Sequence, residues 1–446
     1  MTVQERSSGS PTAQRVSQYL ADVARQLEGL SGQTIAERVE NLVTTNDEWR
    51  ARRCLNMNPA ESLMSSRSRR LLSSDIATRL TEGLPGAKLY PHGRQNDFID
   101  EIEATIIALV RRQFQATYVE WRPISTSMAS AAAFFTHLQA GDVLLSQDED
   151  AGGNYVYNQS GPAGLSGAVI KPIPRLGEAF EIDIAALATA VERLRPKMIA
   201  FGGSNILFPY PVREMRRIAE RVGAVLLYDA AHVGLLISSG SFQRPLSEGA
   251  HIVTMSTHKI MGGPVGGLLL TNDPAIAQKV SEVTFPSLLQ TRDLNKLAAF
   301  AIALCELQTF GTELATAMVN NAQVLAKALE TEGFTVLASD RGYTRTHQLF
   351  LKLAAEAKKF ETRCNEANIL ISDCALTGDM AVSKRTGSRI ATHEVTRLGM
   401  KEAEMKEIAR LMRRVFEGEV PQRIASRVEE LRASFGSNVF SFDPSG

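Results

Sequence analysis

The stretch Met255-Ser256-Thr257-His258-Lys259-Ile260-Met261-Gly262-Gly263-Pro264 decides the fold of this chain. It closes an apolar run at residues 251–254 and precedes the Gly-Gly-Leu-Leu-Leu segment at 266–270. This pattern predicts a buried strand that breaks into a tight glycine turn and is followed by another strand. A lysine in such a turn lies in surroundings that lower its pKa and favour Schiff-base chemistry. We therefore expect Lys259 to form a Schiff base with a carbonyl compound.

Short apolar runs bounded by Gly, Pro or Asp alternate with amphipathic helical segments between about residues 100 and 300. This alternation predicts an α/β fold with a mostly parallel, doubly wound sheet. The expected strands are 143–145, 168–170, 198–201, 224–228, 252–254 and 268–270. Ligands of such sheets bind at the carboxyl ends of the strands, so the polar residues that follow these runs are the candidates for a site.

We expect three parts along the chain. Residues 1–75 form an N-terminal tail and helical arm, 76–305 a large cofactor-binding domain, and 306–446 a smaller α+β domain. The small domain should contain strands at 348–351 and 369–371 and a helix at 402–416.

Two helical regions flank the sheet region. Residues 1–14 carry no apolar period and are expected to be a flexible tail. Residues 15–50 should be helical and bury one apolar stripe, and 294–332 should form one or two helices that link the domains. The stripe consists of Val16, Tyr19, Leu20, Val23, Leu27 and Leu30 and continues with Ile35, Val39 and Leu42.

The composition limits the class of partner. Lys plus Arg and Asp plus Glu each number 49, so the formal net charge is zero and favours neither nucleic acid nor an anionic membrane as partner. No apolar stretch is expected to reach the roughly 20 residues that cross a bilayer, and residues 1–14 lack the apolar core of a signal peptide, which predicts a cytoplasmic protein. The four cysteines have no ligand spacing, so we expect ordinary thiols, with no disulfide framework and no metal site.

Ser125, Thr126 and Ser127 precede a run of small residues at 129–133. Their hydroxyls and the N–H groups of a helix N-terminus could hold a phosphate. The alternative is a plain helix cap.

Asp229 ends the most apolar of the expected strands, and His232 follows three residues later. A carboxylate at this place can pair with a pyridine nitrogen and keep it protonated, which makes a pyridoxal ring an electron sink. The alternative is an aspartate that caps the next helix and a histidine buried in the core. The phosphate cradle, the acid and Lys259 occur in this order at strand ends, and this order predicts a pyridoxal phosphate site.

The Thr-His-Lys-x-x-Gly-Gly-Pro string at 257–264, together with these elements and Arg389, resembles serine hydroxymethyltransferase and its relatives of fold type I, over about residues 82–416. The resemblance implies that Lys259 carries pyridoxal 5'-phosphate, that Asp229 pairs with the pyridine nitrogen, and that His232 contacts the ring oxygen. It assigns the phosphate to Ser125, Thr126, Ser127 and His258.

The same resemblance points to substrate-binding residues. Arg389, in the segment 387–390, would grip the substrate carboxylate, for which a bidentate guanidinium is suited. Glu82, in the segment 81–86, would reach the substrate hydroxyl across a dimer interface, with Tyr90 nearby; the alternative is a surface glutamate and a packed tyrosine. Ser204, in the polar segment after the 198–201 strand, is a further substrate-binding candidate. The resemblance thus implies a homodimer with shared active sites.

The chain departs from the family pattern at several positions. The ring-stacking histidine falls at Ala151, and Tyr155 or Tyr157 could fill its space. A tyrosine is replaced by Leu80, an arginine by Val265 and a serine by Ala60, while 287–289 replaces glycines near the neighbouring subunit's phosphate. The strings 342–348 and 439–443 resemble the threonine transaldolase branch of the superfamily.

We therefore expect an enzyme that makes or breaks the Cα–Cβ bond of a β-hydroxy-α-amino acid through a glycyl quinonoid, with an aldehyde as second substrate. One alternative is a folate-dependent hydroxymethyltransferase acting on serine or an α-substituted serine. Others are a pyridoxal phosphate racemase, aminotransferase or decarboxylase, and a cofactor-binding protein without catalytic activity.

Overall fold

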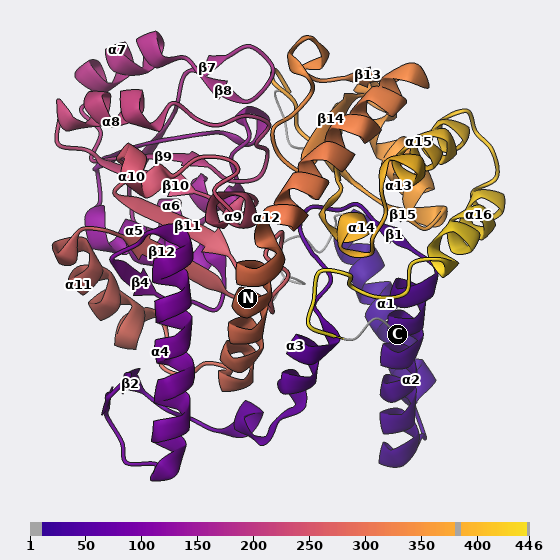
Figure 1. The fold of residues 1–446 in the computed structure, drawn as a ribbon, viewed down its shortest axis with the longest axis horizontal. Helices are drawn as coiled ribbons and strands as arrows, with labels where there is room; N and C mark the ends of the chain where they lie inside the picture. The colour runs from indigo at the N-terminus through magenta and orange to yellow at the C-terminus, as the bar shows by residue number, and fades with distance from the viewer. Residues whose placement is uncertain (1–10, 380–384, 444–446) are drawn as a thin grey trace. The chain divides into compact units, whose positions relative to one another are not determined.

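Residues 54–446 contain a seven-stranded sheet with the strand order β4-β12-β11-β10-β9-β5-β6, which lies in the left half of Figure 1. The computed structural model describes residues 11–379 and 385–443. Five neighbouring strands run parallel, and β12 runs antiparallel to both of its neighbours. The strands are β4 (Tyr118–Glu120), β5 (Val143–Ser146), β6 (Val169–Pro172), β9 (Met198–Gly202), β10 (Val225–Asp229), β11 (Ile252–Ser256) and β12 (Gly267–Thr271). The expected mostly parallel α/β sheet is confirmed.

Two details of this sheet differ from the sequence analysis. The edge strand β4 was not predicted, because three residues are too few to show a period. The strand β12 is antiparallel because residues 257–266 connect it to β11 by a turn, whereas a parallel neighbour needs a longer crossover connection.

Helices cover both faces of the sheet, which makes it doubly wound. Residues on alternate positions of one strand enter opposite cores: Ile199 and Phe201 face one, and Met198 and Ala200 face the other. The first face carries α4 (Arg94–Phe114), α7 (Ile184–Leu194), α8 (Val212–Glu220), α9 (Gly234–Ser238) and α12 (Leu294–Thr331). The second face carries α5 (Thr126–His137), α6 (Pro162–Leu165) and α11 (Pro274–Glu282).

A second, four-stranded antiparallel sheet has its own core. Its strands are, in order, β13 (Thr335–Val336), β14 (Gln348–Lys352), β17 (Gly387–Ala391) and β16 (Ser372–Cys374). Residues of α13 (Ala357–Glu366), α15 (Glu402–Phe416) and α16 (Pro421–Ala433) complete this core, and β1 (Leu55–Asn56) pairs with β15 (Ile369–Leu370) beside it. The strands expected near 348–351 and 369–371 and the helix at 402–416 are confirmed. The other short elements are α3 (Ser66–Arg70), β2 (Gly83–Leu84), β3 (Ala87–Lys88), β7 (Arg175–Leu176), β8 (Glu181–Ile182), α10 (Pro245–Glu248) and α14 (His393–Arg397).

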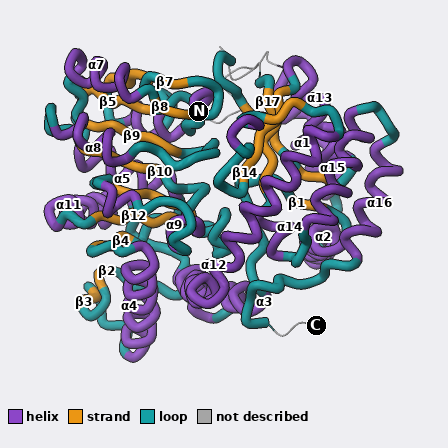
Figure 2. The backbone as a smooth tube through the Cα atoms, turned by 45° about the horizontal axis from the view of Figure 1, so that its top comes forward, coloured by secondary structure: helices purple, strands orange, loops and turns teal. Residues whose placement is uncertain are grey.

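The helix α12 belongs to both cores and lies between the two sheets in both views (Figure 1 and Figure 2). Its first part, to Met318, packs with the large sheet, and Ala322 to Leu329 pack with the small one. The boundary expected after residue 305 therefore falls inside this helix. Against expectation, α12 has the length and apolar composition that a membrane span requires, alone among the described helices, but 61% of its most apolar window is buried within the protein.

Residues 1–53 form a separate unit. It contains α1 (Pro11–Leu27) and α2 (Gly32–Arg52), so residues 11–14 are helical, and the first ten residues of the expected tail lie outside the described part. The expectation of a buried apolar stripe is wrong for this chain: neither helix contains a buried residue, and Tyr19 is 69% exposed and Leu42 61%. Two helices alone enclose too little volume to bury such a stripe.

Gly267 marks a close approach between β12 and the segment before α5. A Cβ atom at this position would lie 2.2 Å from the carbonyl oxygen of Ser125. We expect Gly267→Ala to lower the free energy of unfolding by about 1–3 kcal/mol, because the backbone must shift to admit the methyl group. Gly436→Ala, where a Cβ would meet no atom within 4 Å, is the matched control. Urea titration of both variants measures the difference, and equal stabilities would contradict the prediction.

Candidate active site

The turn between β11 and β12 holds Lys259 by main-chain hydrogen bonds. The N–H of Gly263 donates to the Thr257 carbonyl at 2.8 Å, and the N–H of Gly262 donates to the Lys259 carbonyl at 3.0 Å. Gly262 has φ +68°, and a Cβ there would lie 2.8 Å from the guanidinium carbon of Arg397. The glycines of the sequence string are thus required by the turn and by the arginine packed against it.

Lys259 meets His232 across the end of the sheet. Its Nζ lies 3.1 Å from Nε2 of His232. Burial lowers the pKa of Lys259 to about 8; the Asp229 carboxylate opposes this shift, and the Arg389 charge adds to it. Burial and the neighbouring Lys259 charge hold the pKa of His232 well below its usual value, so a neutral imidazole faces the amine. At neutral to mildly alkaline pH, Lys259 is therefore available in part as a nucleophilic amine.

Asp229 ends β10 and is buried, with both carboxylate oxygens engaged. Oδ1 accepts a hydrogen bond from the N–H of Ala231 at 2.9 Å, and Oδ2 accepts one from the Tyr157 hydroxyl at 2.7 Å. Burial raises the pKa of Asp229, while these bonds and the Lys259 charge oppose the shift. A buried acid with such partners can accept a hydrogen bond from a cationic N–H group.

The N-terminus of α5 lies beside the end of β11. The Ser125 hydroxyl accepts a hydrogen bond from the Met128 N–H at 3.2 Å, so the helix-cap role holds for Ser125, whose hydroxyl proton stays available to an acceptor. Thr126 shares a buried hydrogen bond with Ser256 of β11, and Ser127 is exposed. This arrangement places hydroxyls and helix N–H groups next to the strand that leads to Lys259, as a phosphate cradle requires.

Arg389 reaches the large sheet from β17 of the small one. Its Nη1 donates to the Ser204 carbonyl at 3.2 Å and to Oδ1 of Asn205 at 3.3 Å, and its Nε donates to the Ser372 hydroxyl at 3.4 Å. All three acceptors are neutral, and no carboxylate contacts Arg389 within the described parts of the chain. Its charge is therefore free to bind an anion such as an amino acid carboxylate. The Ser204 hydroxyl itself accepts from Asn154 at 3.0 Å.

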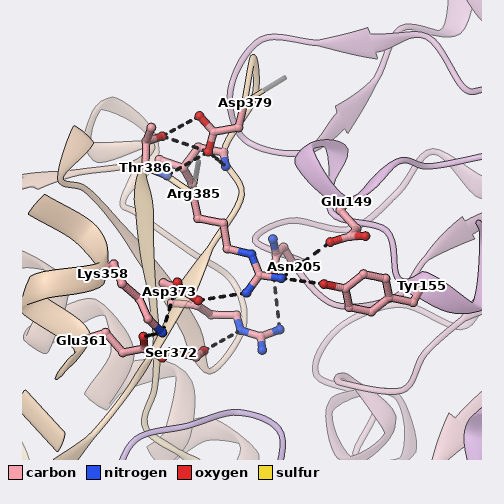
Figure 3. Close-up of polar contacts among 12 residues, drawn as sticks. Glu149, Tyr155, Asn205, Lys358, Glu361, Ser372, Asp373, Asp379, Arg385 and Thr386 are labelled. Atoms are coloured by element: carbon pink, nitrogen blue, oxygen red, sulfur yellow. Dashed lines mark hydrogen bonds and ion pairs between the residues drawn. The ribbon is translucent and has the colours of Figure 1, made fainter. Parts of the chain in front are cut away.

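Arg389 opens into a cavity of about 410 Å3 whose other charges are paired. Arg385 donates to Asp373 at 2.9 Å and to the Tyr155 hydroxyl at 2.8 Å, and it lies 3.8 Å from Glu149 (Figure 3). Lys358 pairs with Glu361 and Asp373 at the rim. Arg389 is thus the charged group of this cavity that lacks an ionic partner among the described residues.

Sequence reasoning missed several residues that hold this site. Gln348 donates to the Ser204 carbonyl at 3.0 Å and accepts from the Ile206 N–H at 3.0 Å, which fixes the loop that contacts Arg389. Arg385 and Asn205 carried no pattern that marks a site. Tyr157 was considered only as a stacking group, whereas its hydroxyl bonds Asp229.

Other expected residues lie elsewhere in a single chain. Glu82 and Tyr90 flank the β2–β3 hairpin, Tyr90 is 54% exposed, and no contact of the described residues joins either to Lys259.

Ala151 is buried and offers no ring, and the hydroxyl of Tyr155 accepts a hydrogen bond from Arg385. His258, next to Lys259, is partly buried, and its Nδ1 lacks a hydrogen-bond partner within residues 11–379 and 385–443.

The family model for "Serine hydroxymethyltransferase" matches residues 33–412, which is most of the chain. The chain belongs to the serine hydroxymethyltransferase family. The serine hydroxymethyltransferase of Korarchaeum cryptofilum (strain OPF8) is 36% identical over 426 residues, covering 91% of this chain and 96% of that protein. That of Methanothermobacter thermautotrophicus is 35% identical over 421 residues, covering 93% of this chain and 98% of that protein.

A similar structure is the crystal structure of L-threonine transaldolase from Pseudomonas fluorescens in its internal aldimine state. It has a TM-score of 0.85 and 24% sequence identity, and the match covers 95% of this chain and 96% of that one. At this identity the similarity establishes the shared fold, which is fold type I of pyridoxal phosphate enzymes.

The family makes this serine hydroxymethyltransferase homologue a pyridoxal 5'-phosphate enzyme. The side chains at this site fit the cofactor. They are the half-buried amine of Lys259 with its lowered pKa, the buried carboxylate of Asp229 at 2.7 Å from a tyrosine hydroxyl, and the hydroxyls at the N-terminus of α5. The Nδ1 atoms of His232 and His258 are buried and without partners among the described groups, which leaves two donors or acceptors for a ligand.

We expect the amine of Lys259 in the cofactor-free protein to titrate with a midpoint of about pH 8. Labelling by an amine-reactive reagent, followed by mass spectrometry of the Lys259 peptide, measures the midpoint. Arg389→Leu should raise it, because a nearby positive charge that disfavours the ammonium ion is removed. The exposed Arg345 supplies the control variant, Arg345→Leu. A wild-type midpoint near the ordinary value of about 10.4 would contradict the prediction.

Proposed function

We propose that this serine hydroxymethyltransferase homologue breaks and forms the Cα–Cβ bond of β-hydroxy-α-amino acids, with an aldehyde as the second substrate. The observation that carries the proposal is the guanidinium of Arg389, which has no ionic partner among the described residues, lines a cavity, and by its charge lowers the pKa of Lys259. An α-amino acid presents a carboxylate and an amine at neighbouring positions, and these two groups match Arg389 and the lysine site.

The side chains divide the work between binding and proton transfer. Arg389 holds the substrate carboxylate, and Asn205 and Ser204 orient the guanidinium. When bound, pyridoxal phosphate supplies the aldehyde to which amines attach and the ring that accepts electrons from Cα. Lys259 has a pKa of about 8 and can accept or donate a proton near neutral pH. His232, kept neutral, hydrogen-bonds the amine and orients it.

We infer that Glu82 of a second copy moves the proton of the substrate hydroxyl. In one chain Glu82 and Tyr90 flank the β2–β3 hairpin, and the apolar side chains Leu84 on it and Leu89 beside it are exposed. An exposed apolar patch of this kind is a protein contact surface. In a homodimer whose hairpin surface packs against the active site of the other copy, Glu82 of one copy would lie near Lys259 of the other.

A folate-dependent hydroxymethyltransferase is the second candidate, because the curated relatives carry the name serine hydroxymethyltransferase. The replacement of glycines at 287–289 favours the aldehyde instead, since it alters the surroundings that the family uses for phosphate and folate. The transaldolase-like strings at 342–348 and 439–443 agree with this preference.

Substrate assays separate the two candidates. Purified holoenzyme is incubated with L-threonine and a second aldehyde, and with L-serine in the presence and absence of tetrahydrofolate. We expect exchange of the aldehyde into a new β-hydroxy amino acid without folate. Glycine formation from serine that depends strictly on tetrahydrofolate would assign the folate-dependent reaction. The variant Lys259→Ala is the negative control.

Substitution of the carboxylate-binding arginine tests the binding mode. We expect Arg389→Lys to raise KM for the amino acid by about 10- to 100-fold, because a bidentate charge-assisted contact becomes a single one. Steady-state kinetics with Arg345→Lys as control measure the change. An unchanged KM would place the carboxylate elsewhere.

Mixing two inactive variants tests the shared site. We expect Glu82→Gln to lower kcat by about 100-fold or more, in the range of a lost general acid–base group. Co-expression of Glu82→Gln with Lys259→Ala should restore activity, because each mixed dimer then contains one site with both residues intact. Persistent inactivity of a purified, differently tagged heterodimer would contradict the cross-subunit role.

A further inference from the structure

Tyr157 is a buried tyrosine whose hydroxyl points at the site carboxylate. Its Oη donates to Oδ2 of Asp229 at 2.7 Å, and its ring packs edge-on against Phe134 with centroids 5.9 Å apart. The side chain is fully buried in the core beneath α5. The hydroxyl therefore has a defined partner and little freedom to turn away from it.

The loop that carries Tyr157 is held in place by its own close contacts. Asn154 accepts a hydrogen bond from the Val156 N–H at 3.1 Å and so starts the short helical turn Tyr155–Tyr157. A Cβ atom at Gly161 would lie 2.0 Å from the Tyr155 carbonyl, and one at Gly153 would lie 1.9 Å from the Gln147 carbonyl. Because glycine is required at both ends of this loop, the position of Tyr157 is set by backbone packing.

Asp229 experiences two opposing influences. Burial favours its protonated form, whereas hydrogen bonds from the Tyr157 hydroxyl and the Ala231 N–H, together with the charge of Lys259, favour the carboxylate. Each carboxylate oxygen accepts one of these two hydrogen bonds, so the two bonds together also fix the plane of the carboxylate. Removing the phenol hydroxyl would leave Oδ2 buried without this donor.

We propose that Tyr157 is a positioning residue that keeps Asp229 ionised and oriented, so that the proton shared with the cofactor's pyridine nitrogen stays on the nitrogen. The inference rests on the proposed pairing of Asp229 with that nitrogen. A carboxylate with fewer hydrogen bonds binds a proton more tightly and would draw it away from the ring. The tyrosine thereby sets how strongly the ring accepts electrons.

The variant Tyr157→Phe removes only the hydroxyl, and Tyr228→Phe is its matched control. Tyr228 is also fully buried and directly precedes Asp229 in β10, but its hydroxyl bonds Gln243 at 3.2 Å. Both variants thus lose one buried hydroxyl hydrogen bond, and only Tyr157→Phe takes a bond away from the carboxylate.

The first readout uses the cofactor-free protein and needs no activity. Removing the phenol hydroxyl makes the folded protein bind the Asp229 proton more tightly and leaves the unfolded chain unchanged. The stability of the variant therefore falls further than that of wild type as rising pH ionises the carboxyl. The difference in Tm between wild type and Tyr157→Phe should therefore widen as the pH rises from about 4. The corresponding difference for Tyr228→Phe should stay constant. Parallel curves for the two variants would overturn the proposal.

The second readout uses the holoenzyme. We expect Tyr157→Phe to weaken cofactor binding by about tenfold and to shift the pH dependence of the bound cofactor's visible absorption, because a hydrogen bond to a charged group is lost. Tyr228→Phe should leave both unchanged. Wild-type affinity and an unshifted spectral titration in Tyr157→Phe would contradict the inference.

Asp229→Asn separates this inference from the proposed function. If Asp229→Asn retains the wild-type spectrum and activity, the proposed role of Asp229 fails. If Asp229→Asn loses them while Tyr157→Phe behaves like Tyr228→Phe, only the role of Tyr157 fails. Should Tyr157→Phe fold poorly, it is made in the Asp229→Asn background, where the hydroxyl should matter far less. A stability loss of equal size in both backgrounds would overturn the proposal.

Discussion

The carboxylate of Asp229, buried at the end of the central strand β10, is the constraint around which the site is arranged. A buried charge without partners is strongly destabilising, so the fold must supply donors or an opposite charge. Three groups from different parts of the chain do so: the Ala231 N–H, the Tyr157 hydroxyl and, by its charge, Lys259. Each arrives from a loop at the carboxyl edge of the sheet, where parallel strands all end.

The position of Arg389 depends on a contact between the two sheets. Arg389 belongs to the small sheet but donates to Ser204 and Asn205, which follow a strand of the large one. The helix α12 contributes to both cores and so ties the sheets together along its length. Because neutral acceptors hold Arg389, its charge stays available, while Arg385 beside it is consumed by Asp373 and Glu149. Arg385 and Arg389 thus differ in charge pairing: carboxylates neutralise Arg385, whereas only neutral acceptors contact Arg389 among the described residues.

Most of the central sheet and the lysine turn could be predicted from sequence, because apolar runs and glycine turns are local patterns. The predicted set Lys259, Asp229 and His232 lies together at the strand ends. The direction of β12 and the edge strand β4 were not predicted, and for α1 and α2 the helices were predicted correctly but their exposure was not. Burial of the stripe on those helices depends on what packs against it, and an amphipathic period does not specify a partner.

The sequence by itself determined the family, the cofactor class and the order of Asp229, Lys259 and Arg389 along the chain. These follow from short strings whose glycines and charged groups have local physical requirements. Only the tertiary structure decided that Tyr157 serves Asp229, that Gln348 and Asn205 support the Arg389 site, and that Glu82 lies apart from Lys259 within one chain. The reason is that hydrogen bonds between distant loops depend on distances of a few tenths of an ångström, and these are set by packing of the whole fold.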